Sequence, residues 1–534
     1  MRTSTLSLLT LALPALAAAG GGCKGPGHGD GKGHGDGKGH GKGKGGHPHN
    51  KPLVTSQKLQ SLISTEDLLA GSQKLQDIAY ANGGNRAFGS SGHNATVDFL
   101  YRELTALDGY YDVQKQAFTE IYSEGSGSLT VDGIGSVEAE IMTYTPAGTA
   151  TGARLVAVAN VGCDPADYPA EVEGNIALVL RGDCAFADKS VRAHAAGAVA
   201  AVVYNNVPGT LAGTLGAPSD EYAPIVGISQ EDGQAILAKL EAGEEVTADL
   251  TVESVVEERV TFNVIAETKD GDHDNVLIVG GHSDSVPAGP GINDDGSGTI
   301  GILNVAKALS KFRVNNAVRF AFWSAEEFGL LGSYAYVNSL NSSAAEVAKI
   351  RAYLNFDMIA SPNYILGIYD GDGDAFNLTG PAGSDVIERG FEDFFKKKGV
   401  PSVPTEFSGR SDYAAFIENG IPSGGLFTGA EVLKTEEEAE LFGGEAGVAY
   451  DVNYHLAGDT IDNLAVDAFL LNTQAIADAV ATYARSWDAL PPVSANERRW
   501  DGDRAQMLRR SGGAHGHAGS HKGSPCGGED RVAV

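Results

Sequence analysis

The sequence predicts an α/β protein in which a mixed β-sheet is flanked by helices and carries an inserted β-rich module. From Thr261 onward, short apolar runs typical of strands alternate with helical patterns, and this alternation favours a sheet covered by helices. Residues 128–257 differ, because short Val, Ala, Ile and Leu runs alternate there with Gly and Pro, as in a small β-rich unit. A chain of 534 residues is also too long for one ordinary core, so we expect more than one domain.

Residues 1–19 have the three parts of a signal peptide. Arg2 supplies a positive charge, Leu6 to Leu16 form an apolar core, and Ala17 to Ala19 provide a small-residue cleavage site. The apolar core is much shorter than the roughly 20 residues of a transmembrane helix, and no later segment is long and apolar enough to span a membrane. We therefore expect a secreted protein without a membrane partner. Delivery to a vacuole is the alternative, because it begins with the same signal.

Two segments of biased composition frame the predicted fold. Residues 20–53 are rich in Gly, His and Lys, and residues 491–534 return to this composition. Neither segment can bury a core, so both are predicted to be disordered, and the first is alternatively a pro-region. Between them we expect the N-terminal part of the main domain at residues 54–127, where apolar residues recur at helical spacing. The insert at residues 128–257 and the rest of the main domain at residues 258–490 follow.

Charge and cysteine content restrict the partners and the compartment. The formal charge of −30 comes from 69 acidic and 39 basic side chains, which makes nucleic acid an unsuitable partner. Cys163 and Cys184 both lie in the insert, and a disulfide between them is chemically allowed outside the cytosol. The pairing of Cys23 and Cys526 stays open. Glycosylation sequons begin at three positions, namely Asn94, Asn341 and Asn377.

Four clusters of polar residues follow strand-like runs after Thr261. The first contains His282 and Asp294 in Gly-rich turns, and we expect a helix to begin at the adjacent Asp295. The other three clusters are Ser-Ala-Glu326-Glu327-Phe-Gly, Asn355-Phe-Asp357-Met and Tyr454-His455-Leu-Ala-Gly-Asp459-Thr. Loops at the carboxyl ends of strands carry the chemistry of α/β sheets, so we expect these clusters to meet there.

One acid at a strand end is most simply explained as the cap of the next helix. Together, however, the clusters supply two histidines and three or more carboxylates, a set suited to zinc. A carboxylate shared by two ions about 3.5–4 Å apart is an arrangement used for peptide hydrolysis. Neighbouring residues on an extended segment point in opposite directions. Of Glu326 and Glu327, one can therefore bind metal while the other faces substrate and transfers a proton.

These runs resemble peptidase family M28, and within it the secreted aminopeptidases. The motifs that carry the resemblance are GGHSDSV…GPGINDDGSG, SAEEFGLLGS, NFDM, GRSDY and YHLAGDT. The run Asn82-Gly-Gly-Asn-Arg86 and the helix after it also resemble the N-terminal region of those enzymes. The insert, with NIALVLRGDCAF, resembles a protease-associated (PA) domain. The resemblance covers about residues 55–490 and implies the zinc exopeptidase fold. The combination with a PA domain is most similar to fungal leucine aminopeptidases and vacuolar aminopeptidase Y.

The resemblance implies a metal-binding role for each of five residues. Asp294 would bridge two zinc ions per subunit. His282 and Asp357 would hold one of the ions, and Glu327 and His455 would hold the other. In the family, the peptide bond after the bridging aspartate is cis, which here is the bond between Asp294 and Asp295.

The resemblance also assigns the residues around the metal. Glu326 would be the general base and then the general acid, and Asp284 would orient His282 through its ring N–H. Tyr454 would donate a hydrogen bond to the developing oxyanion. Arg410 of GRSDY matches an arginine that contacts substrate in the secreted enzymes.

The implied function is a secreted zinc aminopeptidase that removes leucine and other large apolar residues from peptides with a free N-terminus. We expect a monomer. A carboxypeptidase with a PA insert is one alternative, although little room remains after residue 490 for the further helical domain of such enzymes. A receptor-like protein without activity is another, and the five intact ligand positions argue against it. A single-zinc glutaminyl cyclase shares the fold, but the NDDGSG and GRSDY motifs and the insert disfavour it.

Several other polar residues have simpler explanations than a functional site. His93, His194 and His273 lie outside the motifs and are predicted to be ordinary surface or packing histidines. The run from Asp370 to Asp374 imitates a calcium-binding EF-hand loop, but Ala375 and Pro381 replace the required Gly and Glu. We therefore reject that interpretation.

Overall fold

The computed structural model describes residues 51–340 and 343–492. The predicted signal peptide, nearly all of both biased segments, Asn341, Cys23 and Cys526 lie outside the described residues. Within the described ranges, no helix has both the length and the apolar character needed to cross a membrane.

A mixed 15-stranded sheet forms the centre of the fold. In the main domain its order is β14 (Val403–Thr405), β13 (Gly367–Tyr369), β15 (Ser423–Phe427), β12 (Ile350–Phe356), β10 (Asp272–His282), β11 (Asn316–Trp323) and β9 (Thr247–Thr268). It continues through β4 (Gly148–Ala157), β5 (Ile176–Leu180), β6 (Ala200–Tyr204), β8 (Ile225–Ile228), β3 (Glu140–Thr143) and β7 (Gly213–Thr214). Strand β1 (Tyr111–Val131) pairs with β9 and with β2 (Gly135–Val137).

The four central strands of the main domain are parallel and therefore end on the same side of the sheet. His282 of β10 pairs with Trp323 of β11, Gly280 of β10 pairs with Asn355 of β12, and Phe356 of β12 pairs with Leu426 of β15. Parallel strands of this kind are buried on both faces, and all seven residues of β12 are buried. This register brings the polar clusters that follow β10, β11 and β12 to one edge.

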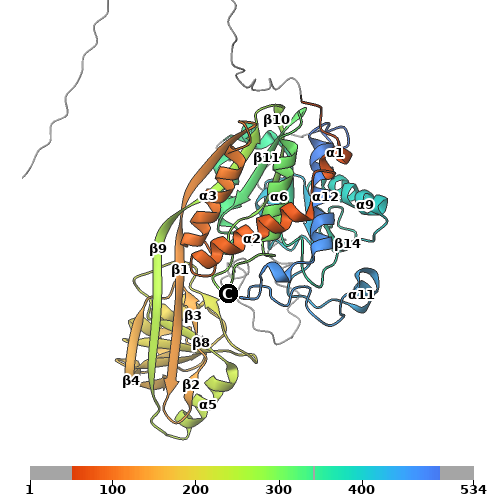
Figure 1. The fold of residues 1–534 in the computed structure, drawn as a ribbon. Coiled ribbons are helices and arrows are strands. Elements are labelled where there is room, and N and C mark those ends of the chain that lie inside the picture. The colour runs from red at the N-terminus through yellow and green to blue at the C-terminus, as the bar shows by residue number, and fades with distance from the viewer. Residues whose placement is uncertain (1–50, 341–342, 493–534) are drawn as a thin grey trace, which may run out of the picture. The chain divides into compact units, whose positions relative to one another are not determined.

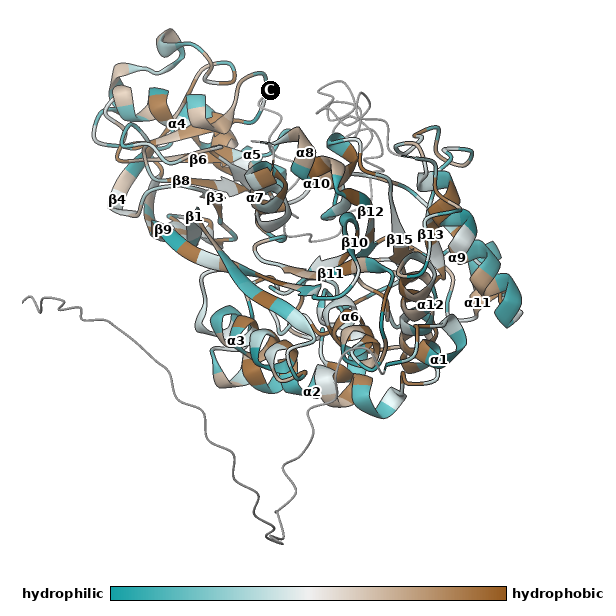
Figure 2. Ribbon diagram, turned by 90° about the horizontal axis from the view of Figure 1, so that it is seen from above, coloured by the Kyte–Doolittle hydropathy of each residue, from teal (hydrophilic) through white to brown (hydrophobic). Residues whose placement is uncertain are grey.

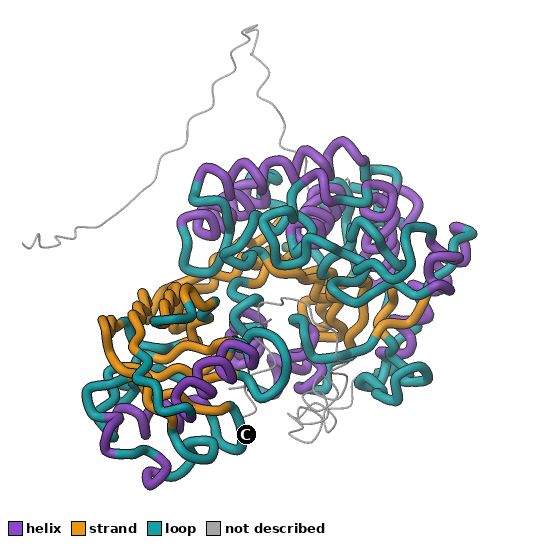
Figure 3. The backbone as a smooth tube through the Cα atoms, turned by 90° about the horizontal axis from the view of Figure 1, so that it is seen from below, coloured by secondary structure: helices purple, strands orange, loops and turns teal. Residues whose placement is uncertain are grey.

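Helices cover both faces of these strands, as the alternating pattern predicted (Figures 2 and 3). One hydrophobic core joins the sheet to helices α1 (Ser56–Gln60), α2 (Thr65–Ala81), α3 (Ser91–Thr105), α6 (Gly296–Leu309), α9 (Ser384–Lys398) and α12 (Val466–Tyr483). The core on the opposite face includes residues of α7 (Leu331–Leu340), α8 (Ala344–Ala348) and α10 (Tyr413–Glu418). The exposed helix α11 (Glu436–Phe442) contains the acidic run and buries none of its residues.

A long two-stranded ribbon connects the main domain with the insert (Figure 1). Strands β1 and β9 pair antiparallel without interruption from Tyr111↔Thr268 to Val131↔Ala248. One end of β9 also pairs with β11 of the main domain, and its other end pairs with β4 of the insert. The predicted limits of the insert, at residues 128 and 257, fall inside these continuous strands, so they stay a prediction.

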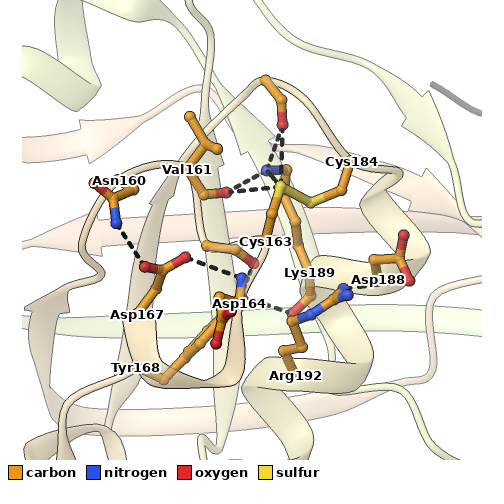
Figure 4. Close-up of a disulfide and its surroundings, with 12 residues drawn as sticks. Asn160, Val161, Cys163, Asp164, Asp167, Tyr168, Cys184, Asp188, Lys189 and Arg192 are labelled. Carbon is orange, nitrogen blue, oxygen red and sulfur yellow. Dashed lines mark hydrogen bonds and ion pairs between the residues drawn. A yellow bond between two sulfur atoms is a disulfide. The ribbon is translucent and has the colours of Figure 1, made fainter.

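The insert has cores on both faces of its strands. They include residues of α4 (Phe186–Ala195) on one face and α5 (Gln230–Glu241) on the other. The predicted disulfide between Cys163 and Cys184 is formed. Figure 4 shows the Lys189 ammonium beside it, where it donates to the carbonyl oxygens of Val161 and Gly182. Two short 3-10 helices, η2 (Pro165–Asp167) and η3 (Ala170–Val172), lie in the segment between β4 and β5.

Candidate metal centre

Five predicted ligand residues meet at the carboxyl ends of the central strands. His282 is the last residue of β10, and Asp357 directly follows β12. Glu327 lies on the turn after β11, Asp294 directly precedes the N-cap of α6, and His455 lies in the loop before the short helix η4 (Ile461–Asn463). All five are buried. Five separate segments therefore place histidine and carboxylate side chains at one point.

The Asp294 carboxylate lies between the two histidines. Its Oδ1 is 3.1 Å from Nε2 of His282, and its Oδ2 is 3.1 Å from Nε2 of His455. Glu327 Oε2 is 3.0 Å from the same His455 nitrogen, and Asp357 Oδ1 is 3.5 Å from the His282 nitrogen. Each oxygen of Asp294 therefore faces one histidine, and each histidine also faces a second carboxylate.

Several buried polar atoms in this cluster lack a hydrogen-bond partner within the described part of the chain. They are Nδ1 of His282, Oδ2 of Asp284, Oε1 of Glu327 and Oδ1 of Asp357. A buried polar group without a partner is costly, and carboxylates packed against one another repel. Ligand atoms of His282, Asp294 and Glu327 lie within 4.8 Å of one another, as do those of His282, Glu326 and Asp357. Imidazole and carboxylate groups at such distances fit a divalent cation.

Burial and charge move the pKa values of these groups away from their ordinary range. Burial raises the pKa of Glu326 and of Glu327. For His282 burial lowers the pKa, but the carboxylates of Glu326 and Asp357 more than offset it, and the pKa rises well above its usual value. Burial also raises the pKa of Asp294, but the hydrogen bonds with both histidines outweigh it and lower the pKa. Burial and the neighbouring charges therefore act in opposite directions on the pKa values of His282 and of Asp294.

Comparisons with known proteins identify the family. The profile of peptidase family M28 matches residues 263–480, and the profile of the PA domain matches residues 151–236. An Aspergillus fumigatus protein named probable leucine aminopeptidase 2 is 60% identical over 446 residues, which cover 83% of this chain and 88% of that protein. The chain belongs to peptidase family M28.

Two solved structures extend the likeness to the fold. The aminopeptidase from Aneurinibacillus sp. strain AM-1 has a TM-score of 0.63 and 29% identity, and the match covers 82% of this chain and 99% of that one. BSAP, a zinc aminopeptidase from Bacillus subtilis, has a TM-score of 0.58 and 25% identity, with 84% and 98% covered. The predicted M28 fold with a PA insert is thereby confirmed.

Two aspartates hold the Asp294 loop of this M28 chain. Asp459 accepts the backbone N–H groups of Asn293 at 2.7 Å and of Asp294 at 3.0 Å. Asp451 accepts from the side-chain amides of Asn293 at 2.7 Å and of Asn463 at 2.9 Å. Burial raises the pKa of Asp459 to about 8. The sequence placed Asp459 in the fourth cluster but gave no sign of Asp451, which lies outside every motif.

Asp295 fixes the other side of the bridging residue. Its side chain caps α6 by accepting from the N–H of Gly298 at 2.8 Å, as the predicted helix start requires. It also accepts the N–H groups of His282 and of Met358, each at 3.1 Å. The bond between Asp294 and Asp295 is cis, as the resemblance implied. One carboxylate thus joins β10, α6 and the loop after β12.

A buried arginine from the N-terminal region supports the loop between His282 and Asp294. The Arg86 guanidinium donates to the carbonyl oxygens of Ser283, Pro290 and Gly291, with 2.8 Å to Pro290. Its backbone N–H donates to Ser285 Oγ at 2.9 Å. Arg86 is fully buried. Sequence reasoning assigned Arg86 no partner, because these contacts join residues about two hundred positions apart.

The turn that carries Glu326 and Glu327 has an unusual backbone. The residues Ala325 and Leu330 have φ of 58° and 59°, a left-handed conformation that costs a non-glycine residue on the order of 1 kcal/mol or more. Asp284 Oδ1 accepts the backbone N–H of Glu326 at 3.1 Å, and the same oxygen lies 3.6 Å from Nδ1 of His282. Asp284 therefore contacts both the turn and the histidine that it is predicted to orient.

The tyrosine and arginine of the later motifs lie together beside His455. The Tyr454 ring stacks on the His455 ring with 3.8 Å between centroids. Arg410 donates from Nη2 to the Tyr454 hydroxyl at 3.3 Å, and its Nη1 is 2.7 Å from Glu431 Oε1. The structure thus brings Arg410 to the phenol. Its predicted contact with substrate stays a prediction.

The remaining histidines and sequons mostly lie apart from the cluster. His194 is exposed and His273 is half-exposed, whereas His93 is buried, with Nε2 3.2 Å from Ser283 Oγ. Asn94 and Asn377 are exposed and accessible to modification.

A second acidic group is held by its own turn. Asp370, Asp372 and Asp374 have carboxylate oxygens close enough for one cation. Both Asp370 oxygens, however, accept backbone N–H groups, from Gly373 at 2.8 Å and from Phe376 at 2.8 Å. These contacts support the rejection of a calcium loop.

Proposed function

We propose that this chain is a secreted aminopeptidase with two zinc ions per subunit, which removes leucine and other large apolar residues from peptides with a free N-terminus. The observation that carries the proposal is the position of Asp294, whose two carboxylate oxygens each face a different histidine. The relatives named leucine aminopeptidase and zinc aminopeptidase support the reaction and the metal.

Asp294 would be shared by the two ions. His282 and Asp357 would complete one site, and Glu327 and His455 would complete the other. When bound, zinc supplies a Lewis acid for the scissile carbonyl and lowers the pKa of water. The unpartnered carboxylate oxygens of Glu327 and Asp357 support this assignment because metal coordination would satisfy them.

Glu326 is the proposed proton carrier. Its Oε2 lies 3.8 Å from Nε2 of His282, next to the proposed ligands. The carboxylate takes a proton from the attacking water as the new C–O bond forms at the scissile carbonyl. It then gives that proton to the leaving amine nitrogen as the C–N bond breaks. Burial raises the pKa of Glu326, which makes its carboxylate a stronger base for the proton of the attacking water.

Tyr454 is the proposed oxyanion donor. Its hydroxyl can donate a hydrogen bond to the oxygen of the scissile carbonyl as negative charge develops there. Stacking on His455 and the contact with Arg410 hold the phenol at the edge of the cluster.

The preference for a free N-terminus has a charge basis. Glu326 and Asp357 are buried carboxylates at the centre of the site, and the α-ammonium group of a peptide would form charge-assisted hydrogen bonds with them. An acetylated N-terminus carries no such charge. The same carboxylates would give no advantage to a peptide bound by its C-terminus, which separates this proposal from a carboxypeptidase.

Secretion is proposed from the signal-like segment and from the disulfide, which forms in oxidising compartments. The exposed Asn94 and Asn377 fit glycosylation along that route. A protein delivered to the vacuole would carry the same signal peptide, disulfide and glycosylation sites. We propose a monomer.

One comparison tests the activity. A leucyl chromogenic substrate and its N-acetylated analogue are incubated with the protein, with and without a chelator. We expect rapid cleavage of the free substrate, little cleavage of the acetylated one and loss of activity with the chelator. Equal cleavage of both substrates, or activity that the chelator leaves intact, contradicts the proposal.

A further inference from the structure

The turn that carries Glu326 is held by its own backbone hydrogen bonds and by residues from outside its segment. Positive φ angles occur at Ala325, Gly329 and Leu330, and left-handed residues this close together persist only where the surrounding structure imposes them. Within the turn, the N–H groups of Gly329 and Leu330 both donate to the Glu326 carbonyl. The side chain of Glu326 needs a firm support, because a general base acts only from within hydrogen-bond reach of its proton.

An aromatic cluster packs on this turn. Phe328, two residues after Glu326, contacts Phe88 with 5.4 Å between ring centroids and Tyr122 with 6.2 Å. Phe88 and Tyr122 contact each other edge to face at 5.7 Å. Ala325, the residue before Glu326, is fully buried in the same cluster. Apolar contacts therefore fix the turn on both sides of the glutamate pair.

The three rings come from distant segments. Phe88 follows α2, Tyr122 belongs to β1 of the ribbon, and Phe328 belongs to the turn itself. Tyr122 pairs with Glu257 of β9, on the stretch of β9 between its junction with β11 and its junction with β4. The ribbon that leads into the insert thus reaches Phe328 of the catalytic turn through the side chain of Tyr122.

An arginine of the same ribbon clamps Tyr122 in place. The Arg259 guanidinium lies over the Tyr122 ring at 3.7 Å from its centroid, and it donates to the Gly89 carbonyl at 2.9 Å. A Cβ at Gly89 would lie 2.7 Å from Arg259 Cδ and 2.9 Å from Tyr122 Cδ2, and Gly89 has φ of +76°. A side chain at this position would be strained and would displace Arg259 or Tyr122. The segment after α2 and the ribbon are in tight contact here.

We propose that Phe88, Tyr122 and Phe328 are positioning residues for Glu326, and that the ribbon between the main domain and the insert thereby supports the catalytic turn. The proposal rests on the role of Glu326 as proton carrier. None of the three rings needs to touch substrate. Each acts by restricting the turn, since a displacement of about 1 Å in a catalytic group can cost as much as 10²-fold in rate.

The test compares purified, zinc-loaded variants on a leucyl chromogenic substrate. Tyr122→Ala removes the ribbon ring, Phe328→Ala removes its partner on the turn, and Tyr122→Phe keeps the ring but removes the hydroxyl. Tyr80→Ala is the matched control, because it removes the same side chain from a position that is 57% exposed on α2. Zinc content and thermal midpoint are measured for every variant, so that loss of metal or of folded protein is counted separately.

We expect Tyr122→Ala and Phe328→Ala to lower kcat roughly 10-fold or more, with KM and zinc content within about twofold of the parent protein. Tyr122→Phe and Tyr80→Ala should behave like the parent. A kcat that stays within twofold in both alanine variants overturns the proposal. A loss of activity that only follows the loss of zinc or of folded protein also overturns it.

The double variant Tyr122→Ala/Glu326→Gln connects the rings to the glutamate. If the rings act through Glu326, their removal costs nothing further once the carboxylate is gone. A further loss of the same size in the double variant contradicts this inference while leaving the proposed function intact. Full turnover of Glu326→Gln alone would instead remove the proposed function itself, so the two failures are distinguishable.

Discussion

Buried charged groups have hydrogen-bond partners in the insert, whereas several of those at the sheet edge of the main domain do not. In the insert, Lys189 is buried, but its ammonium donates to the carbonyl oxygens of Val161 and Gly182. At the sheet edge of the main domain, Glu327 and Asp357 are also buried, yet each keeps a carboxylate oxygen without a partner in the described chain. Residues 128–257 contribute none of the unpartnered buried side-chain atoms found in the described chain.

This difference separates structural from functional burial of charge. Polar groups inside proteins are normally hydrogen-bonded because an unpaired one destabilises the fold. A buried charge whose hydrogen bonds are all made within the protein, as at Lys189, therefore indicates a structural role. Unsatisfied burial of several like charges indicates a site that another species completes. The contrast predicts that changes at the sheet edge affect turnover, whereas changes around the disulfide affect stability.

The largest effect is expected at Glu326. Glu326→Gln keeps the size of the side chain but cannot accept a proton, so kcat should fall about 10²–10⁴-fold, the usual contribution of general acid–base catalysis. The measurement is turnover of a leucyl substrate together with zinc content by elemental analysis. Two zinc ions per chain should remain. Lost zinc in this variant would mean that Glu326 binds metal and that Glu327 carries the proton.

The disulfide should matter for stability and not for turnover. Replacing both Cys163 and Cys184 by Ala opens a loop of 21 residues, and the unfolded chain then gains entropy that destabilises the fold by about 3 kcal/mol. Urea unfolding of the two proteins measures the change, and kcat per folded molecule serves as the control. A drop in kcat at full zinc content would break the distinction between the two regions.

His93 is a buried group of the main domain that has a hydrogen-bond partner, because its ring nitrogen lies beside Ser283, the residue after His282. It therefore tests whether a buried group with a partner near the cluster affects stability. Burial lowers its pKa from 6.5 to about 4, so the unfolded chain binds the extra proton first. Stability is therefore lost as the pH falls from 6.5 towards 4, by roughly 2–3 kcal/mol from this group.

The measurement for His93 is the free energy of unfolding of the parent and of His93→Gln at pH 7, 5 and 4. The parent should lose its advantage over the variant as the pH falls. Other acid-sensitive groups, the metal ligands included, affect both proteins and cancel in the difference. A constant difference across this range would show that His93 is not held neutral.

Much of the site could be predicted from the sequence because its parts are local motifs. The alternation of strands and helices predicted the sheet, and parallel strands necessarily bring the residues after β10, β11 and β12 to one edge. Asp295 was expected at a helix start, where an aspartate is a favoured N-cap residue, and it caps α6. The cysteine pair in the insert was expected from the position of both residues in one segment and from the predicted export of the chain.

The contacts that hold the site together could not be predicted from local motifs. Arg86 binds carbonyl oxygens about two hundred positions away, and Tyr122 reaches Phe328 only because β1 and β9 form one continuous ribbon. Neither residue belongs to a periodic pattern that predicts its partner. His93 was expected to be an ordinary surface or packing histidine, and its burial agrees with packing, but nothing local indicates that Ser283 is its neighbour.

The smallest effect is expected at Lys189, where the insert satisfies its buried charge. Burial lowers the pKa of Lys189 to about 8, so part of what the two carbonyl bonds contribute is offset by desolvation. Lys189→Met keeps the aliphatic stem and leaves Val161 and Gly182 without their donor, which should cost about 1–2 kcal/mol. Urea unfolding measures this, with kcat and zinc content unchanged. If Lys189→Met lowers the free energy of unfolding as much as loss of the disulfide does, the ammonium group links the segments around Val161 and Gly182 as strongly as the covalent bond.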